Sequence, residues 1–93
     1  MRSVIVDAIE GLQLLTFHYK GSHRTVEPHT FGTDTKGHET LCAWQLAGGS
    51  GQGFRDFHLV EMGGVQATGD TFGTARAGYR RGDTTMIRIH AQL

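Results

Sequence analysis

The sequence predicts a mainly β protein: a small five-stranded antiparallel barrel with an N-terminal α-helix and a C-terminal extension or extra strand. Apolar residues recur at helical spacing near the N-terminus, alternate in the runs that follow, and are interrupted there by glycine-rich turns. Two-layer sandwiches usually need more strands, so a bent barrel is favoured. A single domain of 93 residues has room for a small core and one shallow site.

The N-terminal helix is expected to make about two to three turns. Its apolar residues stand at positions 4, 5, 8, 9 and 12, a spacing that places them on one helical face. Ser3 can cap its beginning, and Gly11 stands where it would end. The pattern then changes to strict alternation, so Leu15, Phe17 and Tyr19 share one face of a half-buried strand.

Four further strands are expected before residue 69. They cover Arg24–Phe31, Glu39–Leu46, Phe54–Met62 and Val65–Thr68, with polar or glycine-rich connections between them. Pro28 lies inside the first of these strands. Because proline has no N–H to donate to a neighbouring strand, part of this strand should lie at an edge or a bulge.

Residues 1–69 are expected to form the barrel domain, and residues 70–93 a C-terminal extension. The final stretch, TTMIRIHAQL, alternates well enough for a sixth strand that pairs with the barrel or with another copy of the chain. The net charge of the chain is zero, but its distribution is uneven. Residues 74–93 carry four arginines and one aspartate, whereas residues 1–73 carry five cations and eight anions, so basic charge is concentrated in the tail.

The composition disfavours several classes of protein. A net charge of zero provides no overall attraction to nucleic acid or to membranes. Asp7 and Glu10 interrupt the apolar N-terminal stretch, so a signal peptide or a membrane span is not expected there. The single cysteine, Cys42, excludes an internal disulfide and lies in an apolar run. We therefore expect a cytoplasmic, reducing environment.

The stretch Leu46–Leu59, LAGGSGQGFRDFHL, raises the question of a phosphate-binding loop. Such a loop needs a lysine after its glycines and then a helix, whereas this stretch has no lysine and continues with the alternation of a strand. A hairpin connection is therefore favoured.

No catalytic residue, cofactor or metal site is predicted. The histidines at positions 18, 29, 38 and 58 do not form a close ligand pair, so a zinc site would have to assemble from separate strands. No spacing selects two carboxylates for acid–base chemistry. A small hydrolase that uses Cys42 or histidines is the weakest alternative, because nothing near Cys42 in the sequence would activate its thiol.

Polar and aromatic residues that a core does not require lie on the predicted strands: Tyr19, Arg24, His29, Trp44 and Arg55. They belong to the motifs AIEGLQLLTFHYKG, RTVEPH, GHETLCAW and RDFHL. The order of these motifs over about residues 3–69 resembles the WYL domain, a small Sm-like barrel of bacterial transcriptional regulators.

The chain also departs from the WYL pattern. The name-giving tripeptide stands here as Glu39-Thr40-Leu41 and keeps only its leucine, and Glu61 replaces a usual arginine. The helix-turn-helix that normally precedes the domain is missing, so we do not expect a self-contained transcription factor.

The resemblance implies a non-enzymatic regulatory or sensory module that presents a concave basic and aromatic surface. Its ligand would be anionic, either single-stranded nucleic acid or a nucleotide. Arg24 and Arg55 would hold a phosphate or carboxylate through their forked donors. Tyr19 and Trp44 would stack a base, and His29 would add a donor whose charge depends on pH.

The tail and the strand edges leave further possibilities open. Arg80 and Arg81 are candidates for secondary phosphate contacts, with a solvated basic turn as the simpler interpretation. A different class of function is a structural protein that forms a homo-oligomer or docks on a separate DNA-binding regulator through exposed strand edges. Arg24 and Arg55 would then pair with acidic neighbours, and Trp44 would pack in the core.

Overall fold

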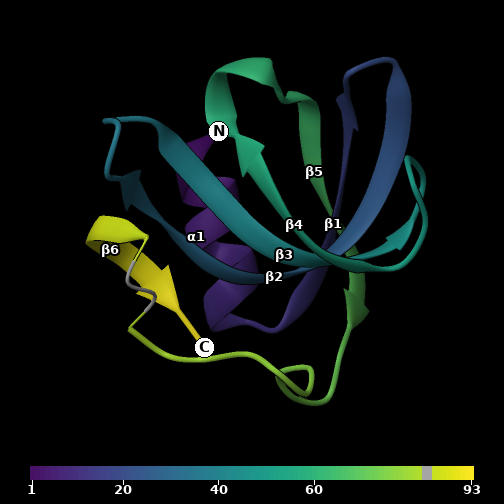
Figure 1. Ribbon diagram of the computed structural model, residues 1–93. Helices are drawn as coiled ribbons and strands as arrows, with labels where there is room; N and C mark the ends of the chain where they lie inside the picture. Colours follow the sequence, from purple (N-terminus) through teal and green to yellow (C-terminus); the bar gives the residue numbers. More distant parts are fainter. Residues whose placement is uncertain (83–84) are drawn as a thin grey trace.

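The computed structural model describes residues 1–82 and 85–93 and shows a bent antiparallel sheet with a helix packed against it (Figure 1). The elements are α1 Arg2–Glu10, β1 Gln13–Tyr19, β2 Ser22–Asp34, β3 Glu39–Ala47, β4 Gly53–His58, the 3-10 turn η1 Leu59–Glu61, β5 Gly63–Thr71 and β6 Met86–Gln92. The strand order is β4-β3-β2-β1-β5, and β6 pairs with β2. The predicted mainly β class, with an N-terminal helix and an added C-terminal strand, is confirmed.

The long strand β2 organises the sheet. One edge pairs with β3 along most of its length, and the other pairs with β1 through Ser22–Val26 and then with β6 through Thr30–Asp34. Pro28 stands in the gap between these two partners, where no N–H is required, and the pairing with β3 shifts register between Pro28 and Thr30. The sequence predicts an edge or a bulge in this strand, and the strand has a register shift next to Pro28.

Helix α1 differs from the prediction at its beginning and agrees with it at its end. Its N-cap is Met1, whose carbonyl accepts the N–H of Ile5, so Ser3 lies within the first turn and does not act as the cap. At the other end, Gly11 is the C-cap and its N–H donates to Asp7 O at 2.8 Å.

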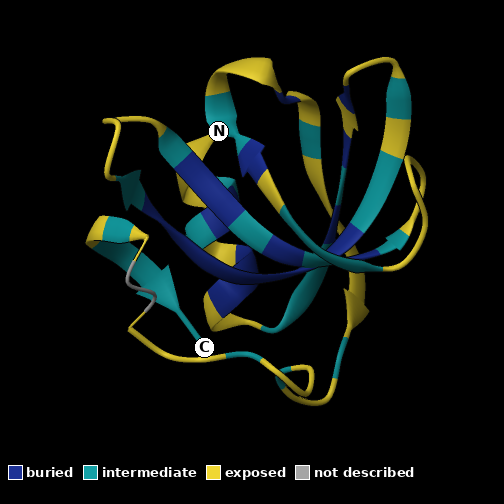
Figure 2. Cartoon of the chain, in the orientation of Figure 1, coloured by how far each residue is buried: buried dark blue, intermediate teal, exposed yellow. Residues whose placement is uncertain are grey.

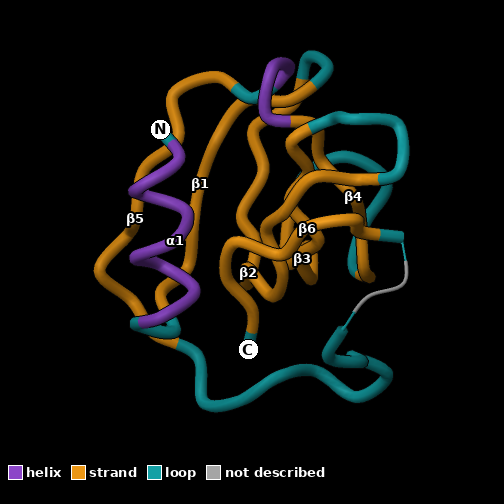
Figure 3. Tube along the Cα trace, turned by 90° about the vertical axis from the view of Figure 1, so that its left-hand side faces the viewer, coloured by secondary structure: helices purple, strands orange, loops and turns teal. Residues whose placement is uncertain are grey.

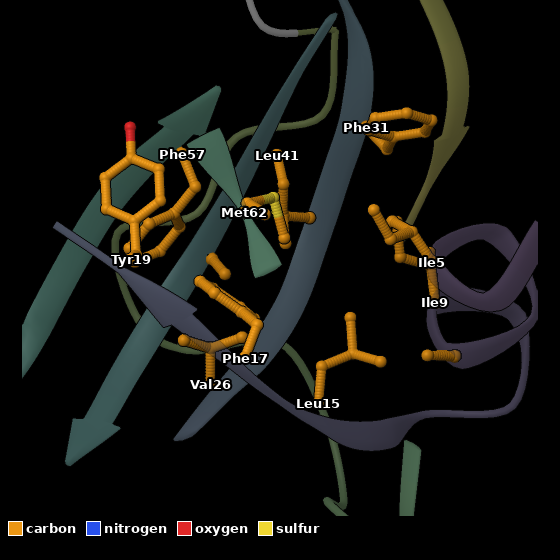
Figure 4. Close-up of a cluster of buried hydrophobic side chains, with 12 residues drawn as sticks. Ile5, Ile9, Leu15, Phe17, Tyr19, Val26, Phe31, Leu41, Phe57 and Met62 are labelled. Carbon is orange, nitrogen blue, oxygen red and sulfur yellow. The ribbon is translucent and has the colours of Figure 1, made fainter. Parts of the chain in front are cut away.

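The hydrophobic core lies between α1 and the sheet (Figure 4). Phe17 and Phe57 pack edge to face with ring centroids 4.9 Å apart, and Ile5 and Ile9 of α1 close the other side of the cluster. We call the core-facing side of the sheet the inner face and the opposite side the outer face. Figure 2 shows burial concentrated on β2 and β3, whereas β5 is exposed along almost all of its length.

The region between β4 and β5 was predicted less accurately. The expected strand to Met62 stops at His58, and η1 turns the chain so that Met62 enters the core. β5 is longer than expected and runs to Thr71, so the domain boundary predicted at residue 69 falls inside a strand. In the described part of the chain no recorded pairing joins β4 to β5, and closure of the sheet into a barrel stays a prediction.

Residues beyond β5 pass across the outer face before the chain re-enters the sheet as β6, and Figure 3 shows this long connection running below the strands. Of the two partners predicted for the last strand, the barrel or another copy, β6 pairs with β2 of its own chain. Within the described residues, no helix is long and apolar enough to cross a membrane.

Candidate functional site

The five residues predicted to bind a ligand lie on two opposite faces of the sheet. Tyr19, Arg24 and Arg55 occupy the inner face, and His29 and Trp44 the outer face. Directly opposed residues of an antiparallel pair share a face, which assigns Tyr19, Arg24, Trp44 and Arg55. His29 lies at a register shift and is placed on the outer face by the contact of its ring with Phe54. The five side chains therefore cannot contact one small ligand together in this arrangement.

Arg24 lies opposite the buried Phe17 in the β1–β2 pair, and its side chain links β2 to β1 and β3 on the inner face. Its guanidinium donates to Gln45 Oε1 at 2.8 Å and to Tyr19 O at 3.1 Å. It also lies over the rings of Tyr19 and Phe57, at 5.6 and 5.9 Å from their centroids. These contacts hold both terminal nitrogens of the guanidinium within the fold, whereas its buried Nε has no hydrogen-bond partner among the described residues.

Gln45 links the glycine-rich connection of residues 48–52 to the sheet through hydrogen bonds. Its side chain is fully buried, and its amide nitrogen donates to Gly48 O at 2.7 Å and Gly51 O at 2.6 Å. Gly48 has a φ of +94°, which a residue with a side chain rarely adopts. The stretch is therefore a hairpin connection between β3 and β4, as the sequence predicts, and not a loop that opens toward a phosphate.

Arg55 holds the same connection from β4. It donates to Ser50 Oγ at 3.1 Å and to Phe54 O at 2.8 Å. Of the acidic neighbours that could have paired with the two inner arginines, Glu27 instead pairs with Arg76, and Glu61 lies 3.8 Å from Lys20 Nζ.

Tyr19 is a core residue whose hydroxyl contacts the backbone of His58 and the side chain of Glu61. Its hydroxyl accepts the N–H of His58 at 3.1 Å and points away from the apolar cluster (Figure 4). Burial raises the pKa of this phenol above its usual value. The ring packs on Phe57 at 5.0 Å, so it is not open for stacking with a base.

On the outer face, residues 72–82, which we call the covering segment, lie over β2, β3 and β4. Arg76 donates to both carboxylate oxygens of Glu27, at 2.7 and 3.1 Å, and these two hydrogen bonds raise the pKa of the guanidinium further. The same guanidinium lies 5.1 Å from the centroid of the Trp44 ring. Trp44 is half-buried beneath it on the outer face and is not part of the hydrophobic core.

His29 lies under the covering segment with no exposed surface. Its Nδ1–H donates to Glu27 O at 2.8 Å, and its Nε2 accepts the backbone N–H of Arg76 at 3.0 Å. Its ring is surrounded by the rings of three residues, Phe54, Phe72 and Tyr79. Desolvation by this burial lowers the pKa of His29, so the ring is neutral near pH 7.

A hollow of about 340 Å³ opens between the outer face and the covering segment. We call it the arginine hollow; its lining residues are Cys42, Phe54, Gly78, Tyr79, Arg80, Arg81 and Gly82. The Tyr79 hydroxyl hydrogen-bonds with Thr30 Oγ1 at 3.0 Å, and Arg81 Nε donates to Leu93 O at 2.8 Å. These contacts hold the Tyr79 ring and the Arg81 guanidinium at the rim of the arginine hollow.

Both arginines that the sequence offered as secondary contacts, Arg80 and Arg81, thus line the arginine hollow. Sequence reasoning placed Tyr79 near these arginines but did not place Phe54 there. The only local signal was the run Tyr79-Arg80-Arg81, because Phe54 lies on a strand remote in sequence.

The sequence analysis also missed a cluster of three potential metal ligands. Asp34, His38 and His58 each offer one ligand atom, and these atoms all lie within 4.8 Å of one another. Asp34 and His38 flank the turn between β2 and β3, and His58 ends β4. The spacing of Asp34 and His38 around Gly37 is a weak sequence signal, and only the strand pairing adds His58.

No protein-family model, curated protein or solved structure matches this chain. The resemblance to the WYL domain stays a prediction. The fold and the outer face define the class: a small mainly β domain with a basic and aromatic hollow.

Proposed function

We propose that this chain is a non-enzymatic regulatory or sensory module that binds a nucleotide in the arginine hollow, either a free nucleotide or one unit of a single strand. The observation that carries the proposal is the combination of two guanidinium groups, Arg80 and Arg81, with two aromatic rings, Phe54 and Tyr79, around one hollow. The WYL resemblance supports the same ligand class, with the site on the opposite face from Arg24 and Arg55.

The chemistry of the lining matches the two parts of a nucleotide. Guanidinium groups bind phosphate oxygens through parallel N–H donors, and aromatic rings stack on bases. A volume of about 340 Å³ falls at the lower end of the range of small-molecule sites, which suits a mononucleotide better than a larger effector. The excess of arginine in residues 74–93 adds local attraction for an anion.

Calorimetric titration with AMP, ATP and a short oligothymidylate tests the proposal. We expect Arg80→Ala/Arg81→Ala to weaken binding at least about tenfold, since two charged hydrogen-bonding groups are lost. The control Lys20→Ala/Arg88→Ala removes the same charge elsewhere and should change affinity less than about twofold. Affinity should fall with added salt, more steeply for the oligonucleotide if a strand is the natural ligand.

Equal binding by the wild type and the Arg80/Arg81 variant would refute this site. If Arg55→Ala lost binding while Arg80→Ala/Arg81→Ala kept it, the ligand site would lie on the inner face instead. Absence of measurable binding to all three probes would reject the nucleotide class.

A second candidate function, self-association, is favoured by the exposed strand edges. Ile87 on β6 is 68% exposed, and β6 pairs with β2 alone in the described part of the chain. Pairing of this edge with a second copy would bury the side chain and satisfy the free backbone groups. Sedimentation of the wild type and Ile87→Asp tests it: a dimer that the aspartate dissociates supports self-association, and a wild-type monomer rejects it.

A further inference from the structure

We propose that Asp34, His38 and His58 form a binding site for a borderline divalent transition-metal ion such as Zn²⁺, Co²⁺ or Ni²⁺. The site lies where the turn between β2 and β3 meets the end of β4. It is separate from the arginine hollow, because His58 stands four residues beyond Phe54 on β4, about 13 Å along the strand.

The ligand atoms are already spaced almost as a metal ion requires. His38 Nδ1 lies 3.5 Å and His58 Nε2 lies 3.8 Å from the same oxygen, Asp34 Oδ2. Two ligands on a tetrahedral ion with bonds of about 2.0–2.2 Å are about 3.4 Å apart. The two histidine nitrogens lie within 4.8 Å of each other, and their rings pack with centroids 4.4 Å apart at 35°, so both imidazoles would have to rotate to direct these nitrogens at one ion.

Asp34 is held in position by the turn that it caps. Its Oδ1 accepts the N–H groups of Lys36 at 2.9 Å and His38 at 2.8 Å, which leaves Oδ2 directed at the histidines. Thr40 Oγ1 donates to Oδ2 at 3.3 Å and opposes His58 in the β3–β4 register.

The surroundings leave room for an exchangeable ion. The three side chains line a hollow of about 210 Å³, to which Asp56 contributes a second carboxylate and Lys36 an opposing positive charge. Two imidazoles and a carboxylate suit Zn²⁺, Co²⁺ and Ni²⁺ better than Mg²⁺ or Ca²⁺, which prefer oxygen ligands alone. Three protein ligands leave at least one position for water, as in sites where the ion exchanges.

Titration of the full chain with Co²⁺, followed by visible d–d absorption, and with Zn²⁺ by calorimetry tests the site. The test variants are Asp34→Asn, which keeps an oxygen to cap the turn, His38→Gln and His58→Gln. The matched control is His18→Gln/His23→Gln, an exposed cross-strand pair with ring centroids 4.9 Å apart. No third ligating group accompanies that pair among the described residues.

We expect one ion per chain, and each test variant should weaken affinity at least about tenfold while the control stays within about twofold. Addition of Zn²⁺ to the wild type should shift the imidazole nitrogen resonances of His38 and His58 and leave those of His18 and His23 unchanged. This measurement does not depend on the folding of any variant. Unsaturable binding, equal losses in the control, or shifts at the wrong histidines would overturn the proposal.

Discussion

His29 shows how neighbours, and not residue type, set the behaviour of a polar side chain in this chain. One ring nitrogen donates to Glu27 O and the other accepts the N–H of Arg76, which defines a neutral ring with its proton on Nδ1. A second proton would have to point at an N–H group. The residue that the sequence offered as a pH-dependent ligand donor therefore acts as a buried link between β2 and the covering segment.

This arrangement predicts a loss of stability in mild acid. The folded state resists protonation of His29, whereas the unfolded chain binds the proton near the ordinary pKa of about 6.5. The contribution of neutral His29 to the free energy of unfolding is thus complete above about pH 6.5 and declines as the pH falls below it. Urea denaturation at about pH 7.5 and about pH 5.5 measures the decline.

His29→Gln should be less stable than the wild type at neutral pH and should show a flatter pH dependence over the same interval. His18→Gln changes an exposed histidine and should preserve the wild-type slope. Asp34 and Glu39 also have lowered pKa values, but their contributions are lost at more acidic pH. An unchanged slope in His29→Gln would contradict the assignment.

Packing of the hydrophobic core predicts a large loss of stability when Phe17 is truncated. Phe17 has no exposed surface and packs edge to face on Phe57. Phe17→Ala should lower the free energy of unfolding by about 3–5 kcal/mol through lost burial and a cavity. Val60, which is 89% exposed, provides the control, and Val60→Ala should stay within about 0.5 kcal/mol. Chemical denaturation would contradict the core assignment if both variants behaved alike.

At the scale of elements, the β3–β4 hairpin depends on side chains from inside the sheet. Gln45 makes three hydrogen bonds, to Arg24, Gly48 and Gly51, that join the connection to β2. Such an arrangement explains why four glycines in six residues can form an ordered hairpin. The conformation of this connection therefore depends on hydrogen bonds from Gln45 as well as on the backbone freedom of its glycines.

Gln45→Leu should therefore destabilise the protein by about 2–4 kcal/mol, because a similar volume is kept while three hydrogen bonds are lost. Gln52→Leu, in the exposed part of the same connection, should have little effect. Guanidinium denaturation gives both values, and hydrogen exchange should show faster exchange in residues 48–53 of the Gln45 variant. Equal stabilities would show that the hairpin does not need this bracing.

At the scale of the whole molecule, the C-terminal residues complete the sheet. The covering segment shields the outer face of β2, and β6 pairs with the second half of β2 along the edge that β1 does not reach. α1 packs against β6 as well as β1, β2 and β5. Residues 70–82 and 85–93 are therefore a structural part of the unit formed by residues 1–69.

A chain that ends at residue 71 should consequently fail to fold cooperatively, since it exposes the backbone of β2 and leaves the buried Glu27 without Arg76. Amide NMR dispersion and near-ultraviolet circular dichroism would detect the loss. Arg76→Ala in the full chain should be destabilised without unfolding. A truncated chain with native spectra would show that the first 71 residues are an independent domain.

Much of the architecture could be predicted from local pattern. Helical spacing located α1, Gly11 marked its end, and Pro28 marked the bulge, because each depends on the conformational limits of neighbouring residues. The turn η1 was missed, since Phe57 and Leu59 continue the alternation of the strand although the chain leaves the sheet at His58.

The sequence by itself determined the helix and the approximate positions of the strands, and the concentration of basic charge in the tail. Tertiary structure alone decided which side chains meet: Arg76 reaches Glu27 across 49 positions, and His58 joins Asp34 across the width of β3. The physical reason is that periodicity fixes the face of a residue within its own strand, whereas strand order, register shifts and the path of the C-terminal residues decide what lies opposite that face.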